Sequence, residues 1–231
     1  MKVKVWMLLG LLFIMIVVLS ATNAVHAVEA IAKVPVGTGP WGVAYDSGKG
    51  EIFVANHYDN TVSVISDSSN TVVATIPVGI EPVGVAYDSG KGEIYVTNNG
   101  AGTVSVISDS THTVVATLNV HAGGPGVAYD SAKGVIFFSG SNGHNVTVWV
   151  MSDDTYAIVA NLTLGRGSSY DVVYDSAMGE VFVPDGNGAV YVISDSSLPS
   201  PSPTVPEFTP AAILILATTT CIIVIAFRKK H

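Results

Sequence analysis

Three histidines occupy loop positions from which their side chains could converge. His57 and His144 each follow the second strand predicted for an internal repeat, and His121 follows a fourth strand. Clustered imidazoles are common metal ligands. The intervening repeat, however, carries no histidine at its equivalent loops, and no carboxylate is placed to orient these rings. The sequence therefore predicts neither a metal site nor a bound cofactor.

Eight aspartates recur at the opposite ends of the predicted strands. They are Asp46, Asp67, Asp88, Asp109, Asp130, Asp153, Asp175 and Asp195. So many carboxylates suggest calcium, which takes six to eight oxygen ligands. Most of them open a turn rich in serine or glycine, however, where aspartate caps its own backbone amides. Turn capping is the preferred interpretation.

Side chains that depart from the repeat are better candidates for a binding site, because a unique ligand site needs unique residues. These candidates are Trp41, His57, His121, His144, Arg166 and Tyr170. Spacing assigns no nucleophile, base and orienting group among them, so no catalytic residue is predicted. Two Asn-X-Thr sequons make Asn145 and Asn161 candidate glycosylation sites.

The elements that position these residues come from a fourfold internal repeat. A 15-residue pattern begins GVAYDSGKGEI in its first copy and occupies residues 42–56, 84–98, 126–140 and 171–185. Its tyrosines, at 45, 87, 129 and 174, are 42, 42 and 45 residues apart. The repeats extend over about 38–79, 80–121, 122–164 and 165–196.

Each repeat contains four strand-length segments bounded by turn residues. In the first copy they lie around 43–45 and at 51–55, 61–66 and 71–76. Four strands in 40 to 45 residues is the spacing of a β-propeller blade. Apolar residues fall on both faces of the second and third segments, as in blades packed between two neighbours. The sequence predicts an all-β propeller of four four-stranded blades.

The segment Tyr95-Val96-Thr97-Asn98 matches the signature of the YVTN-repeat β-propellers. The resemblance covers residues 28 to about 196, through four copies, and is specific for the fold. That family is found in archaeal surface-layer proteins and bacterial exported proteins. The resemblance implies a propeller domain over 28–196 but no particular activity.

The last repeat stops after its third strand, whereas an extra strand precedes the first repeat. Residues 30–37 match residues 72–79, a fourth strand and its exit. We therefore expect strand 30–36 to complete the last blade and close the propeller, which removes unpaired strand edges. Three assemblies remain open: a closed four-blade ring, an eight-blade ring of two chains, and an open fragment.

The N-terminus has the three parts of a secretory signal peptide. Lys2 and Lys4 precede an uncharged stretch over 5–19, and small residues follow up to Ala27. Residues 1–27 are predicted to be the signal, with cleavage after Ala24 or Ala27; an uncleaved anchor is the alternative.

The C-terminus is predicted to cross a membrane. Residues 209–227 carry no charge and are long enough to span the hydrocarbon core, and the basic tail at 228–231 stays cytoplasmic. A stalk rich in proline and serine, 197–208, precedes this helix. The expected topology is a type I single-pass protein with its domain outside the cell.

The stalk ends in Pro206-Glu207-Phe208, followed by the apolar segment and the basic cluster. This order resembles the PEF-type sorting signals of archaeal surface proteins. The resemblance implies cleavage near the tripeptide by an archaeosortase-type transpeptidase and transfer to a lipid anchor. Permanent anchoring by the helix is the other possibility.

Charge restricts the partners. The chain carries a net charge of −8, and residues 28–200 hold 17 acidic and 5 basic residues, a net −12. Such a surface repels nucleic acid and anionic lipid. The expected function is a non-catalytic binding or surface-layer module that contacts surface-layer proteins or glycans, with a homodimer among the open assemblies. The alternative is an exported enzyme, a lactonase-like hydrolase or a quinoprotein-like oxidoreductase, which rests on fold analogy alone.

Overall fold

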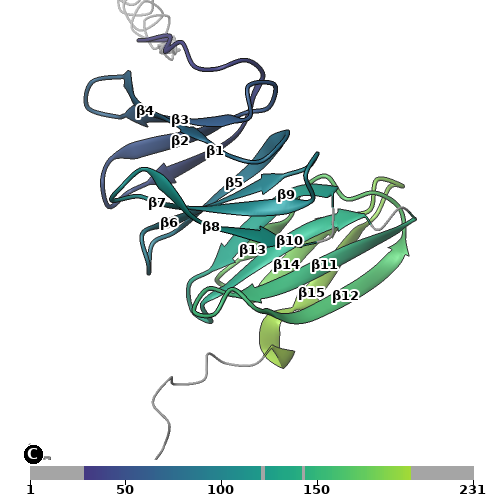
Figure 1. Cartoon of the computed structure of the whole chain (residues 1–231). Coiled ribbons are helices and arrows are strands. Elements are labelled where there is room, and N and C mark those ends of the chain that lie inside the picture. The colour runs from purple at the N-terminus through teal and green to yellow at the C-terminus, as the bar shows by residue number, and fades with distance from the viewer. Residues whose placement is uncertain (1–28, 121–122, 142–143, 199–231) are drawn as a thin grey trace, which may run out of the picture. The chain divides into compact units, whose positions relative to one another are not determined.

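Four antiparallel β-sheets make up the part of the chain that the computed structural model describes, residues 29–120, 123–141 and 144–198 (Figure 1). The predicted signal peptide, the Pro-Glu-Phe tripeptide, the predicted membrane span and His121 lie outside these residues. Within them, none of the helical structure is long and apolar enough to cross a bilayer.

Each sheet corresponds to one sequence repeat, with its strands hydrogen-bonded in chain order. The first sheet contains β1 (Pro40–Asp46), β2 (Glu51–Asn56), β3 (Thr61–Ser66) and β4 (Thr71–Pro77). The second contains β5 (Pro82–Asp88), β6 (Glu93–Asn98), β7 (Thr103–Ser108) and β8 (Thr113–Asn119). The third contains β9 (Gly123–Asp130), β10 (Val135–Ser141), β11 (Asn145–Ser152) and β12 (Ile158–Arg166). The fourth contains β13 (Val173–Asp175), β14 (Glu180–Pro184) and β15 (Val190–Ser194), which the 3-10 helix η1 (Asp195–Ser197) follows.

The repeat sets the strand register. Tyr45 pairs with Ile52, and the three later copies repeat this pairing at the equivalent positions. The turn between the first two strands ends in a glycine with positive φ, such as Gly50 at 67°, a conformation that strongly favours glycine. The strands predicted from the sequence are confirmed to within a few residues.

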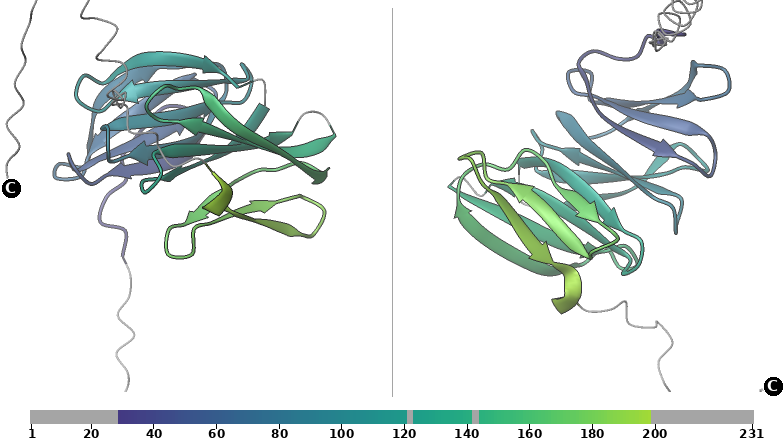
Figure 2. Two further views of the ribbon diagram at one scale, coloured as in Figure 1. Left: turned by 90° about the horizontal axis from the view of Figure 1, so that it is seen from below. Right: turned by 180° about the vertical axis from the view of Figure 1, so that it is seen from behind.

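The core lies between consecutive sheets, because the second and third sheets are packed between two neighbours and the first and last sheets each pack against one. Inner strand β1 packs against β5, β5 against β9, and β9 against β13. Between the first two sheets, fully buried Phe53, Val62 and Val64 meet Ile94 and Val96. The apolar residues on both strand faces predicted this packing. The four sheets thus pack one after another in chain order, with their first strands innermost, as the blades of a β-propeller (Figure 2).

A glycine allows two inner strands to approach closely. A Cβ on Gly84 of β5 would collide with the Pro125 carbonyl oxygen of β9 and lie 2.9 Å from Thr97 Oγ1. That hydroxyl accepts a hydrogen bond from the Gly84 amide (2.8 Å) and donates one to the Pro125 carbonyl (3.0 Å). Gly84 is therefore fixed by backbone contact between blades.

The fourth sheet differs from the other three. Among the described residues it has three strands, as the short last repeat predicted. Residues 29–36, expected to form its fourth strand, have no regular secondary structure.

Candidate functional site

The starts of the inner strands meet at a pocket of about 250 Å³. Trp41 comes from the first blade, Val83 from the second, Pro125 from the third and Tyr170 from the fourth. An adjoining hollow of about 240 Å³ is lined by the same four residues, with Gly42, Gly84 and Asp171. The opening thus collects one nonrepeating side chain from each blade.

Two aromatic rings dominate this opening. Trp41 is 62% exposed and Tyr170 is 70% exposed. The ring of buried His57 supports Trp41, with the two ring centroids 4.3 Å apart, and Tyr58 packs edge-on against His57 at 4.9 Å. Trp41 is therefore held from behind while its other side stays open to solvent.

The remaining groups that line the 250 Å³ pocket are uncharged and polar. They are the side chains of Asn99, Ser141, Ser168 and Ser169. Ser169 is buried and donates to Ser139 Oγ and to the Asp171 carbonyl, each at 3.0 Å, which fixes the loop before β13. Aromatic faces beside hydroxyl and amide groups suit a ligand that combines apolar faces with hydroxyls.

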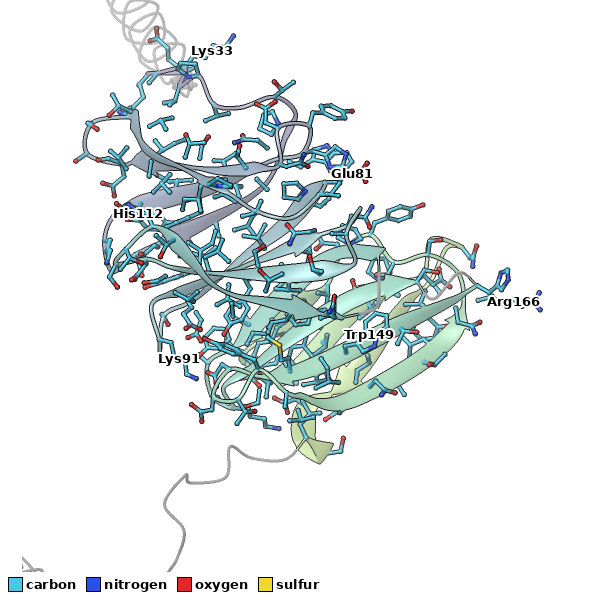
Figure 3. All side chains as sticks on the ribbon, in the orientation of Figure 1. Lys33, Glu81, Lys91, His112, Trp149 and Arg166 are labelled. Carbon is cyan, nitrogen blue, oxygen red and sulfur yellow. The ribbon has the colours of Figure 1, made fainter. Side chains whose placement is uncertain are left out.

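The structure brings some of the predicted site residues together. Trp41 and Tyr170 line one pocket, and His57 lies directly behind Trp41. His144 is exposed and is not among the residues lining this pocket, and Arg166 points outward at the end of β12 (Figure 3). No group of three His, Cys, Asp or Glu side chains in residues 29–120, 123–141 and 144–198 is arranged to hold a metal ion.

Sequence reasoning missed several lining residues. Val83 and Pro125 follow Trp41 by 42 and 84 residues, so they occupy its repeat position. Comparing that position across the copies would have found them. Asn99 and Ser141 follow His57 by 42 and 84 residues, so the same comparison at the His57 position would have found them. Of the candidate glycosylation sites, Asn145 begins β11, the third strand of its sheet, and Asn161 is exposed on the outer strand β12.

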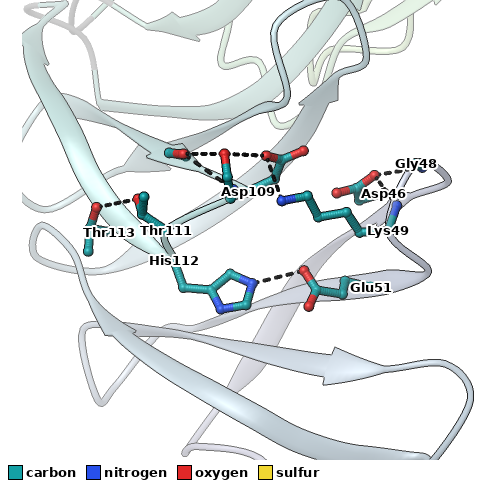
Figure 4. Close-up of polar contacts among 10 residues, drawn as sticks. Asp46, Gly48, Lys49, Glu51, Asp109, Thr111, His112 and Thr113 are labelled. Atoms are coloured by element: carbon teal, nitrogen blue, oxygen red, sulfur yellow. Dashed lines mark hydrogen bonds and ion pairs between the residues drawn. The ribbon is translucent and has the colours of Figure 1, made fainter.

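The opposite face holds the recurring aspartates in a structural role. Asp46 Oδ1 accepts hydrogen bonds from the amides of Gly48 (2.7 Å) and Lys49 (3.1 Å) (Figure 4). Asp88, Asp130 and Asp175 accept the equivalent bonds, which confirms turn capping for these four aspartates. The Lys49 ammonium reaches Asp109 of the next blade at 3.2 Å. The equivalent lysines Lys91 and Lys133 reach Asp153 and Asp195 in the same way. Each turn thus links its own blade to the following one.

Tyrosines on this face predict how stability depends on pH. Burial, followed by the neighbouring Asp46 carboxylate, raises the pKa of Tyr87 from 10 to about 12. The folded state therefore holds this phenolic proton more tightly than the unfolded state. Its contribution to stability is complete below pH 10 and is lost as the pH rises from 10 to about 12.

We expect the melting temperature to fall over that alkaline range and the Tyr87→Phe variant to show a shallower fall, measured by circular dichroism. An unchanged pH profile in Tyr87→Phe would contradict the assignment.

Comparisons with known proteins agree on the fold. No protein-family model and no curated protein matches the chain. Among solved structures, hydrazine synthase from Kuenenia stuttgartiensis is similar with a TM-score of 0.61 and 14% identity over 74% of this chain and 50% of that one. The WD40 β-propeller domain of Doa1 is similar with a TM-score of 0.55 and 18% identity, over 68% of this chain and 51% of that domain. The computationally designed Ika4 protein is similar with a TM-score of 0.56 and 12% identity, over 72% of this chain and 99% of that one.

These similarities establish a β-propeller structure. The chain spans about half the length of the hydrazine synthase chain and of the Doa1 domain.

Proposed function

We propose that this protein is an exported, membrane-tethered propeller of the YVTN-repeat type that acts as a non-catalytic binding module at the cell surface. The observation that carries the proposal is the pocket where exposed Trp41 and Tyr170 face solvent beside uncharged polar groups. Rigid aromatic side chains in such a pocket provide contact area at little entropic cost.

A neutral glycan is the ligand class that best fits this pocket. A sugar ring presents an apolar face that stacks on an aromatic ring, and its hydroxyls exchange hydrogen bonds with serine and asparagine side chains. The Asp171 carboxylate at the adjoining hollow and the acidic surface both disfavour an anionic ligand.

The tether is proposed from the sequence. A signal peptide at 1–27 would export the chain, and the stalk at 197–208 would hold the propeller above the membrane. The apolar segment 209–227 would serve as a membrane anchor or, if the Pro-Glu-Phe motif is cleaved, as a transient sorting signal. In both cases the pocket would be displayed outside the cell, where surface-layer glycoproteins and glycans are available.

The ligand proposal is tested by removing one aromatic ring. We expect the full chain to bind neutral oligosaccharides on a glycan array that carries neutral and acidic sugars. Trp41→Ala should weaken that binding at least tenfold, because truncating a central aromatic contact typically costs more than about 1.4 kcal/mol.

Val115→Ala is the control, since Val115 is an exposed apolar residue on the outer strand β8 and does not line the pocket. Equal losses in the two variants, or no binding of any neutral glycan, would reject the proposal.

A further inference from the structure

The first blade exposes an apolar face. The equivalent face of the second blade is buried against the first blade. Val43 and Tyr45 are 62% and 54% exposed, whereas Val85 and Tyr87, their equivalents in the second blade, pack against the first blade. Ile52, Val54, Ile65 and Val72 are likewise repeated 42 residues later as Ile94, Val96, Ile107 and Val114, which line that same buried interface. All six residue pairs are identical in type. The first blade therefore carries the complete surface that elsewhere receives a preceding blade.

The last blade exposes the complementary face. Val190 and Val192 occupy the positions of Val62 and Val64, which are fully buried between the first two blades. In the last blade the two valines are 57% and 56% exposed. Val173 on the inner strand is exposed as well. This apolar face matches the one that elsewhere packs onto a following blade.

The chain enters the first blade as if it came from a preceding one. Gly37 lies against Asn56 as Gly79 lies against Asn98, since an added Cβ would meet the amide carbon at 2.6 Å in both cases. The backbone bond from His57 N to Gly39 O (2.9 Å) is repeated 42 residues later between Asn99 and Glu81. Gly79 follows β4, the outer strand of the first blade. Residues 30–36 match β4 in sequence, so by the same repeat they correspond to the outer strand of a blade that would precede β1.

The last blade has a place for such a strand. Among the described residues β15 pairs on one side only, with β14, so its other edge is free. An apolar groove of about 190 Å³ lies beside that edge, lined by residues of β12 and β15 that include Leu162 and Ile193. If residues 30–36 paired with β15 as β4 pairs with β3, Val34 would lie opposite Val190 and Ala32 opposite Val192.

We propose that two copies of this chain join head to tail into an eight-blade ring, in which residues 30–36 of each copy form the fourth strand of the other copy's last blade. A single copy leaves both complementary faces exposed. Such a ring has two junctions, each between the last blade of one copy and the first blade of the other. At each junction the apolar faces are buried and the free edge of β15 is paired, which supplies the driving force.

Polar contacts at the junction follow the internal pattern with one exception. Tyr87 lies beside Asp46 of the preceding blade, so Tyr45 would meet Asp175 of the second copy. The His112 ring bonds to Glu51 of the preceding blade at 2.9 Å. At the junction, Asn70 stands in the position of His112, and Glu180 of the other copy stands in the position of Glu51. The exception is Met178, which stands where the other blades carry lysine. The junction thus lacks one Lys–Asp link.

The assembly also completes the binding site, since each copy would contribute its own Trp41 and Tyr170 to a shared opening. The inference goes beyond the proposed function and does not depend on any ligand, because its test measures mass and not binding.

The test is the mass of the full chain in a mild detergent, measured by native mass spectrometry over a concentration series. We expect two copies for the unmodified chain and one copy for Val43→Lys and for Val192→Lys, which place a charge in the junction. Val115→Lys, on an equally exposed valine of outer strand β8, is the matched control and should keep two copies. A single copy for the unmodified chain, or two copies for Val43→Lys, would overturn the proposal.

A second variant strengthens the junction. Met178→Lys restores the missing link to Asp67 of the other copy at both junctions and should lower the dissociation constant up to about thirtyfold, as for two exposed ion pairs of about 1 kcal/mol each. Adding Asp67→Asn should cancel the gain. If Met178→Lys raised the melting temperature while the chain stayed a single copy, the ring would close within one chain, and the proposal would be contradicted.

Discussion

Gly84→Ala is expected to destabilise the propeller by about 3 kcal/mol or more, which corresponds to a fall in melting temperature of roughly 6 to 12 °C for a domain of this size. The added methyl group would collide with the Pro125 carbonyl oxygen of the neighbouring blade. Backbone cannot rotate away as a flexible side chain can, so the two inner strands must separate. Separation would also break the contacts of the Thr97 hydroxyl with Gly84 and Pro125.

The matched control is Gly90→Ala in the turn that follows the same strand. A Cβ there would lie 3.1 Å from the Tyr129 hydroxyl and 3.2 Å from Asp88 Oδ1. The third and fourth repeats already carry alanine at this position, as Ala132 and Ala177. We expect a change of less than about 1 kcal/mol in urea unfolding. Equal stability of the two variants would show that close approach of β5 and β9 is unimportant.

Removal of residues 28–36 is expected to have the largest effect, a fall in melting temperature of 10 °C or more. The deletion removes the strand proposed to pair with β15, so the apolar face of the last blade and its free edge would lose their cover. The mass should change from two copies to one at the same time.

A deletion of the same length in the stalk, residues 199–207, is the control for chain shortening. It removes proline-rich sequence that is expected to make few contacts with the blades. We expect its melting temperature to stay within about 2 °C of the parent, measured by calorimetry on both full-length variants. Equal melting temperatures for the two deletions would refute a structural role for residues 28–36.

Much of the candidate site could be predicted from departures from the repeat. Trp41 stands out because smaller residues occupy its position in the other copies, and Tyr170 because it belongs to the departures in the last copies; the structure places both at one opening. The sequence makes His57 a candidate binding residue, yet its ring is buried behind Trp41. The residue types alone could not distinguish these roles, since burial of a loop side chain depends on how neighbouring loops fold over it.

The sequence by itself determined the strands, their register and the stacking of four blades, because those properties repeat. Tyr45, Asp46 and Gly50 recur with their turn chemistry intact, and local hydrogen bonds and φ preferences act identically in each copy. The turn aspartates could be understood in the same way, since capping is a local interaction.

Only the tertiary structure decided which copies of these shared residues are covered. Val43 and Val85 are identical in type and setting, but one is exposed and the other lies between two blades. The same holds for Val192 and Val64 at the other end of the array. Burial is a property of what packs against a face, and no local pattern encodes the neighbour of the first or the last blade.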